Sequence, residues 1–349
     1  MLLFFMLSPG TLWRLLGHGS WNVHRICFAA FLVALVALNP LLRPDAGILS
    51  RVFDNWLLSL LGCGISFTQP FLGALRLHRL LGDRGIAMSL FATFRLCLAG
   101  TFFNIFLPGS TGGDAYRVYA LGRGLGTGFA PALASITLDR VLGFPSLILV
   151  VLLGMGLNYR FLLGNSPLTK LVPFVAAAGV VCLGMVFYLA WAGRGGGANP
   201  DPGKGNPRSS RPGRLRRLHL LIAGNVRRPA TLPLALIYGG LSHLATIASC
   251  QCFALALGVS GLPWMRYYLI IPLAMTINAI PGAPGGLGQG ELAMAALLGL
   301  ADPGGINPRA GVALMLLFRL SNLFLGLIGG ADYALGGLKK RAGSSSAER

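Results

Sequence analysis

Long apolar runs constrain this chain more than any other feature of its sequence. A helix needs roughly 20 apolar residues to cross the hydrocarbon core of a bilayer. The expected spans are Ile26–Leu42, Val52–Leu72, Ile86–Leu107, Ala130–Leu157, Leu168–Trp191, Thr231–Leu257, Met265–Ile280 and Val312–Leu335. A shorter apolar run, Leu292–Leu300, is typical of a re-entrant helix. We therefore predict an all-α integral membrane protein with about eight transmembrane helices.

The composition favours a membrane protein and argues against a nucleic-acid-binding one. Hydrophobic residues make up 54% of the chain and charged residues 11%, against about 25% charged in soluble domains. The net charge is +19, but the basic residues stand in short runs between apolar stretches, which favours contact with anionic lipid headgroups. The 6 cysteines show no metal-ligand spacing, so we expect no metal and no cofactor.

Polar segments divide the chain into two membrane halves. The expected divisions are an interfacial segment at 1–25, a membrane domain at 26–335 with halves at about 26–192 and 231–335, a flexible linker at 193–230 and a basic tail at 336–349. The linker is rich in Gly, Pro and Ser, and its excess of Arg and Lys predicts a cytoplasmic location for it and for the tail. The linker and the tail can lie on the same side only if the chain crosses the membrane an even number of times between them. Three spans are expected there, so the number is even only if the shorter run also crosses.

Two stretches repeat one pattern: an Asn at the end of an apolar run, then P-G-x-x-G-G, then an acidic residue, and later an Arg within an apolar run. The copies comprise Asn104, residues 108–113, Asp114 and Arg140, and then Asn278, residues 281–286, Glu291 and Arg319. Irregular backbone at membrane depth is tolerated only where it is packed in protein or lines a wet cavity. We therefore predict two pseudo-repeated halves with broken or re-entrant segments at P-G-x-x-G-G that frame a binding site. The alternative is a pair of ordinary turns at the membrane surface.

Charged side chains inside apolar runs are the second signal. They are Arg95, Asp139, Arg140, His243, Glu291 and Arg319, and each Arg or Asp near the bilayer centre costs roughly 2.5–3.5 kcal/mol. Asp139 and Arg140 are adjacent and diverge on a helix, so each should pair across helices; Glu291 is expected to pair with Arg140 or Arg319. Such pairs either orient helices or form a cationic cavity for a lipid phosphate, which the planar guanidinium matches well. We expect His243 to be a packed, hydrogen-bonded histidine and Arg95 to snorkel.

The chain resembles the lysylphosphatidylglycerol synthase transmembrane region, also called the flippase-like domain family. The resemblance rests on four motifs in order: N-x3-P-x3-GGD-x2-R at 104–117, DR-x2-G at 139–143, P-x2-PGG-x-G-x2-E at 281–291, and Arg319. In the aminoacyl-phospholipid synthases of that family, a soluble aminoacyl-tRNA-dependent transferase domain follows, and the membrane region moves the modified lipid to the outer leaflet. This chain shows no such domain, so we expect no synthase activity.

The resemblance implies a protein of the bacterial cytoplasmic membrane that translocates a phospholipid or another anionic lipid between leaflets. The implied partners are membrane lipids, namely anionic or aminoacylated phospholipids or polyprenyl lipids, and a lipid-modifying enzyme. The residues expected to contact the lipid are Asn104, Pro108, Gly112, Gly113, Asp114, Arg117, Asp139, Arg140, Asn278, Pro281, Gly285, Gly286, Gly288, Glu291 and Arg319.

Two other functions stay open from the sequence. The first is a membrane-embedded lipid or glycolipid transferase, for which Asp114 and Glu291 would be the acid or base. The second is a scaffold that docks a lipid-modifying enzyme through the basic linker. The chain contains no Walker A, HExxH or GxSxG motif, so the sequence does not favour an enzyme.

Overall fold

The computed structural model describes residues 46–106, 112–124, 126–195, 226, 228, 230–259, 261–279, 288–302 and 307–335. These residues form helices and contain no strand. In chain order the helices are α4 (Ala46–Asp54), α5 (Trp56–Ser66), α6 (Thr68–Asp83), α7 (Leu90–Phe106), α8 (Gly112–Tyr119), the π-helical turn η1 (Ala120–Gly124), α9 (Phe129–Leu157), α10 (Tyr159–Leu163), α11 (Ser166–Thr169), α12 (Val172–Gly195), α14 (Thr231–Ala256), α15 (Trp264–Ala279), α16 (Gln289–Ala301) and α17 (Pro308–Ala334).

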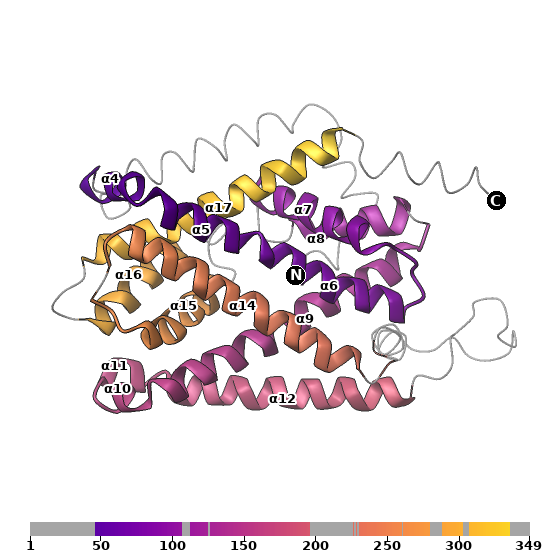
Figure 1. Cartoon of the computed structure of the whole chain (residues 1–349). Coiled ribbons are helices and arrows are strands. Elements are labelled where there is room, and N and C mark those ends of the chain that lie inside the picture. The colour runs from indigo at the N-terminus through magenta and orange to yellow at the C-terminus, as the bar shows by residue number, and fades with distance from the viewer. Residues whose placement is uncertain are drawn as a thin grey trace, which may run out of the picture.

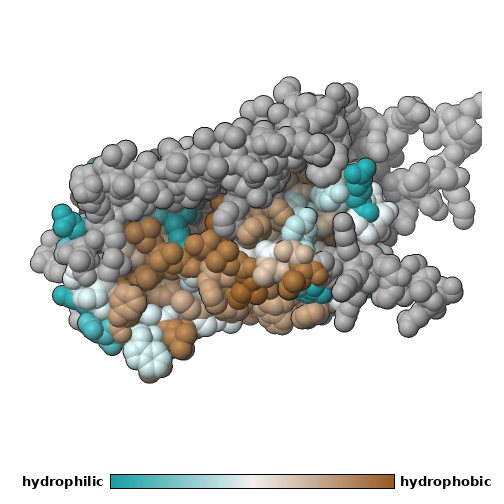
Figure 2. All heavy atoms as spheres, turned by 90° about the horizontal axis from the view of Figure 1, so that it is seen from above, coloured by the Kyte–Doolittle hydropathy of each residue, from teal (hydrophilic) through white to brown (hydrophobic). Residues whose placement is uncertain are grey.

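Five helical segments among the described residues are long and apolar enough to cross a membrane. They are Trp56–Asp83 (α5 with α6), Phe129–Leu157 (α9), Pro167–Gly193 (within α11 and α12), Thr231–Ala256 (α14) and Arg309–Ala334 (α17). Figure 1 shows α12, α14 and α17 running lengthwise through the bundle. Large apolar side chains stay exposed along them, including Phe174, Phe187 and Phe324, and Figure 2 shows a broad apolar surface on one face. A surface of this kind is stable against lipid rather than water.

Polar contacts define the two ends of the bundle. At one end, which we call the Asp83 end, Thr231 Oγ1 donates to the Asp83 carboxylate at 2.6 Å and joins the end of α6 to the start of α14. At the other, the Asn158 end, Asn158 Nδ2 donates to the Met265 carbonyl at 2.8 Å and joins the end of α9 to the start of α15. The spanning helices connect these two ends.

Helices α7 and α8 form a re-entrant pair at the Asp83 end. α7 begins there, after α6, and α8 packs back along it, so that Arg117 Nη2 donates to the Cys97 carbonyl at 3.2 Å. Leu121, just beyond α8, is buried with Leu81 and Ile86 near the end of α6. The start of α7 and the end of α8 therefore both lie at the Asp83 end of the bundle.

Helices α15 and α16 form the matching pair at the Asn158 end. Arg266, at the start of α15, donates to the carbonyl of Ala301 at the end of α16. Asn165 Nδ2, just after α10, donates to the Leu300 carbonyl at 2.9 Å. The second re-entrant pair thus enters the bundle from the opposite end to the first.

The re-entrant pairs correct two predicted spans. Ile86–Leu107 and Met265–Ile280 were expected to cross, but they correspond to α7 and α15, each of which turns back through its partner helix. With this correction, the number of crossings between the linker and the tail is even, as a shared side requires. α14 and α17 are the two crossings after α12, so α12 ends and α17 ends at the same end of the bundle. Irregular backbone inside a membrane is tolerated where it is packed in protein or lines a wet cavity, so such a reversal of an apolar run is physically possible.

The two halves are inverted repeats. α5–α6, α7, α8 and α9 correspond to α14, α15, α16 and α17, and the equivalent elements α6 and α14 pack antiparallel. The last helix of each half packs on the re-entrant pair of the other half: α17 lies along α7, and α9 along α15. In both contacts a glycine meets a backbone carbonyl, Gly329 at Leu98 and Gly154 at Tyr268, where a Cβ atom would collide. The predicted all-α membrane fold with two pseudo-repeated halves is therefore confirmed, whereas most of the two P-G-x-x-G-G segments lies outside the described residues.

Some predictions fall on residues that the structure does not describe. They are the span Ile26–Leu42, the interfacial segment 1–25, most of the linker 193–230 and the tail 336–349. These expectations stay predictions.

Candidate functional site

The first half carries a charged site at the inner end of its re-entrant pair. Asn104, close to the end of α7, accepts a hydrogen bond from the Gly113 backbone N–H at 2.8 Å. Asp114 follows in the first turn of α8 and receives two hydrogen bonds from Arg140 of α9, from Nε at 2.6 Å and from Nη2 at 3.0 Å. Arg117 Nη1 adds a third at 3.3 Å. One carboxylate thus holds two guanidinium groups.

The second half repeats this arrangement with different side chains. Glu291, in the first turn of α16, is buried with 1% of its surface exposed. Arg319 of α17 donates to both of its oxygens, with Nη2 at 3.3 Å from Oε2. Arg319 Nη2 also donates to Asn278 Oδ1 at 3.1 Å. The sequence left open whether Glu291 pairs with Arg140 or Arg319, and the structure selects Arg319.

The two sites occupy equivalent positions in the helices. Asp114 is the third residue of α8 and Glu291 the third residue of α16. Arg140 and Arg319 are each the twelfth residue of their helix. The preceding glycines Gly113 and Gly290 allow the asparagine to approach, because a Cβ atom at either position would collide with the amide oxygen of Asn104 or Asn278. The match of helix position and partner supports the internal repeat that the sequence predicted.

The sites differ in charge and exposure. The first combines Asp114 with Arg117 and Arg140 and has an excess positive charge, whereas Glu291 and Arg319 balance. The side chain of Arg140 is 42% exposed and that of Arg319 22% exposed. The first site is therefore the more accessible of the two and the better suited to an anion.

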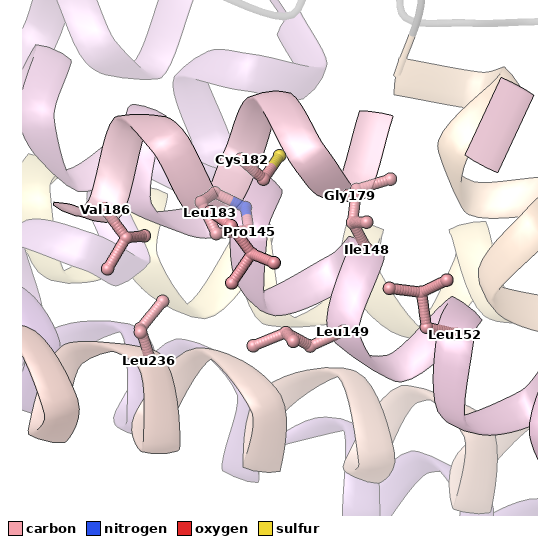
Figure 3. Close-up of a pocket in the computed structure, with 9 residues that line it drawn as sticks. All are labelled: Pro145, Ile148, Leu149, Leu152, Gly179, Cys182, Leu183, Val186 and Leu236. Carbon is pink, nitrogen blue, oxygen red and sulfur yellow. The ribbon is translucent and has the colours of Figure 1, made fainter. Parts of the chain in front are cut away.

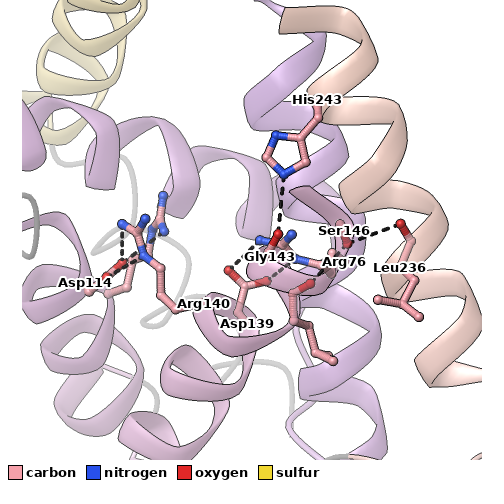
Figure 4. Close-up of polar contacts among 10 residues, drawn as sticks. Arg76, Asp114, Asp139, Arg140, Gly143, Ser146, Leu236 and His243 are labelled. Atoms are coloured by element: carbon pink, nitrogen blue, oxygen red, sulfur yellow. Dashed lines mark hydrogen bonds and ion pairs between the residues drawn. The ribbon is translucent and has the colours of Figure 1, made fainter. Parts of the chain in front are cut away.

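A third charged cluster lies between α6, α9 and α14 (Figure 4). Arg76 of α6 donates from Nε and Nη2 to the two oxygens of Asp139, at 2.7 and 3.1 Å. His243 of α14 donates from Nε2 to the Gly143 carbonyl at 3.4 Å, one turn beyond Asp139 on α9. Arg76 was not predicted as a site residue, because it stands near Arg79 and Arg84 at the end of an apolar run and resembles an interfacial residue.

The structure confirms that Asp139 and Arg140 do not pair with each other. Arg140 forms an ion pair with Asp114, and Asp139 forms one with Arg76, so the two side chains point in different directions from α9. The expectation that Arg95 snorkels without a partner was wrong. Arg95 donates to both oxygens of Asp332 on α17, each at 2.9 Å, because α7 and α17 pack antiparallel.

The glycine and proline residues of the two motifs are only partly described. Gly112 and Gly113 begin α8 and are buried, and Gly288 precedes α16 with a φ of 78°, which favours glycine. Pro108, Pro281, Gly285 and Gly286 lie outside the described residues. In the described part of the chain, no three His, Cys, Asp or Glu side chains lie close enough together to hold a metal ion.

An apolar hollow lies apart from these sites, between α9, α12 and α14 (Figure 3). The residues that line it are Pro145, Ile148, Leu149, Leu152, Gly179, Cys182, Leu183, Val186 and Leu236. The lining offers no charged group, so the hollow cannot recognise a headgroup.

Comparison with known protein families gives one match, which covers most of the chain. Residues 1–330 match the family described as the lysylphosphatidylglycerol synthase TM region. The chain belongs to this family. A search of curated proteins finds no match. Membership confirms the resemblance seen in the sequence motifs, and together with the five apolar helices it makes the chain an integral multi-pass membrane protein linked to lipid handling.

Proposed function

We propose that this member of the lysylphosphatidylglycerol synthase TM region family translocates an anionic lipid between the two leaflets. The observation that carries the proposal is the pair of equivalent carboxylate–arginine sites at the inner ends of two re-entrant pairs that enter from opposite ends. Inverted repeats with broken helices at matching positions are the arrangement that membrane transporters use for alternating access to a central site.

The chemistry of the two sites suits a lipid phosphate. A guanidinium group donates two parallel hydrogen bonds to a carboxylate, and it makes the same contacts to a phosphate. Asp114 and Glu291 hold Arg140 and Arg319 in place at a depth where an unpaired charge would be costly. When a lipid phosphate displaces the carboxylate from one edge of the guanidinium, the charge of the arginine stays compensated. Such an exchange is possible at each half in turn.

The remaining site assignments follow from this exchange. Asn104 keeps α8 in position by accepting from Gly113, and Asn278 orients Arg319. Arg117 gives the first site its excess positive charge. We assign the protein to the bacterial cytoplasmic membrane, with the Asp83 end on the cytoplasmic side, because the basic linker and tail follow helices that end there. The lipid would be an anionic or aminoacylated phospholipid or a polyprenyl phosphate.

The test is lipid movement across the membrane of proteoliposomes. Labelled anionic, zwitterionic and aminoacylated phospholipids and polyprenyl phosphates are compared in vesicles with the wild-type protein, Glu291→Gln, Arg319→Lys and Arg309→Lys. Arg309 is the matched control, because it lies exposed at the start of the same helix α17. The expected result is movement of one lipid class that Glu291→Gln and Arg319→Lys abolish and Arg309→Lys leaves unchanged.

Two other results would contradict the proposal. Movement of no lipid from this panel by a folded wild-type protein would exclude translocation of these classes. Movement that all variants retain would exclude the Glu291–Arg319 site. Lipid analysis of a deletion strain then tests the transferase alternative, since loss of one lipid species indicates synthesis. Deletion of residues 204–217 in the basic linker tests the scaffold alternative, which predicts loss of function.

A further inference from the structure

The cluster of Arg76, Asp139 and His243 breaks the inverted repeat. α14 contains no Arg, Lys, Asp or Glu that could take the place of Arg76 of α6. On α17, Phe318 precedes Arg319 where Asp139 precedes Arg140 on α9. The two helices α14 and α17 are described throughout, and neither repeats the cluster. A buried charged group that occurs in only one of two repeats does not follow from the shared fold and requires its own explanation.

The cluster lies at the contact between the two halves, where a change in its charge can affect how the halves move relative to each other. α6 and α14 are equivalent helices that pack against each other across the contact between halves. Gly239, one turn before His243, faces Arg76 and Ser146, and a Cβ atom there would collide with the Ser146 hydroxyl. Any change in charge at this point therefore acts directly on the contact between α14 and the first half.

We propose that His243 is a proton-binding site that couples lipid movement to a proton gradient, with the Arg76–Asp139 ion pair as its fixed charged neighbours. The inference rests on the proposed translocation and supplies its driving force. Ionisable residues inside membrane spans are costly, and proton relays are one of the functions that explain their presence. Histidine suits this function because its ordinary pKa lies within the physiological range.

The proton balance follows from the hydrogen bond of the imidazole. A carbonyl only accepts, so His243 Nε2 carries the proton that it donates to Gly143, and Nδ1 has the lone pair. Uptake of one proton from water on one side converts the imidazole to imidazolium at Nδ1, and its release on the other side restores the imidazole. The charge of the cluster changes from zero to +1 and back.

The surroundings explain why the protonated form would change the structure. Arg76 is the charged neighbour that acts on His243, and Asp139 already compensates Arg76. Cys97 of α7 and Arg117 of α8 also lie within electrostatic reach of Arg76. A second positive charge beside Arg76 in a low-dielectric contact is repulsive. Protonation therefore favours a conformation in which α14 separates from α6 and α9 and water reaches the imidazole.

The test compares lipid movement in proteoliposomes with and without an imposed pH gradient, with a pH-sensitive dye trapped inside. The variants are His243→Gln, which keeps a hydrogen-bonding side chain but does not titrate, and His78→Gln as the matched control on α6. The wild type and His78→Gln should move lipid several-fold faster with the gradient and carry protons with it. His243→Gln should move lipid at the gradient-free rate in both conditions, without proton flux.

The outcomes separate this inference from the proposed function. Lipid movement that ignores the gradient in the wild type overturns the coupling but leaves translocation intact. Retained coupling in His243→Gln, or its loss in His78→Gln alone, overturns the assignment to His243. A separate measurement does not depend on transport: nitrogen resonances of labelled histidine in the purified protein, with His243 assigned from the variant. The absence of a His243 titration between about pH 4 and pH 8 overturns the site even if no lipid moves.

Discussion

Arg140 and Arg319 hold equivalent places in the two halves of this protein, each as the twelfth residue of its helix and each bonded to the third residue of the preceding helix. They are not energetically equivalent. Asp114 keeps Arg117 as a second partner and is 16% exposed, whereas Glu291 is almost completely buried against Arg319. This difference leads to the first of four predictions.

Removal of the two arginines should have unequal effects on stability. Arg319→Ala leaves the buried Glu291 carboxylate without its cation, and breaking a buried pair in this way costs about 3–5 kcal/mol. Arg140→Ala should cost less, because Arg117 still compensates Asp114. Thermal unfolding in detergent measures both. Equal losses in the two variants would contradict the burial difference, and Arg319→Ala combined with Glu291→Gln should recover part of the loss.

Two glycines of α9 that face different surroundings should respond to alanine with opposite signs. Gly154→Ala places a methyl group against the Tyr268 carbonyl, and such overpacking costs about 1–3 kcal/mol. Gly156→Ala meets nothing within 4 Å, so the higher helix propensity of alanine should stabilise by about 0.5–1 kcal/mol. Unfolding temperatures of the two variants check this. A neutral Gly154→Ala would mean that α9 and α15 do not approach as closely as described.

The inverted repeat predicts which residues share a side of the membrane. In a background without native cysteines, single cysteines at Arg123, beyond α8, and at Asp302, beyond α16, should react with an impermeant maleimide from opposite sides. Arg160, after α9, should label with Asp302, since both lie at the Asn158 end. Labelling of Arg123 and Asp302 from the same side would exclude re-entrant pairs that enter from opposite ends.

The contact between α7 and α17 depends in part on one ion pair, whose two residues can be swapped as a test. Arg95 and Asp332 are 18% and 30% exposed, respectively, so the pair should contribute about 1 kcal/mol or less. Charge reversal at either residue should lower the unfolding temperature, and the double exchange Arg95→Asp with Asp332→Arg should restore most of it. Failure of the double variant to recover would show that Arg95 acts through its contact with the Phe91 ring instead.

Local properties of the sequence were enough to predict a membrane-embedded, all-helical protein and the repeat of Asn, P-G-x-x-G-G, acid and Arg. Apolar runs and the free-energy cost of buried charge are local properties, so they can be read without a fold. The packing of the helices in three dimensions was needed to show that Glu291 pairs with Arg319, that Asp139 pairs with Arg76, and that Arg95 has a partner. It also decided that α7 and α15 turn back within the bundle. These choices depend on which helices pack side by side and in which direction, and residue spacing along one helix does not contain that information.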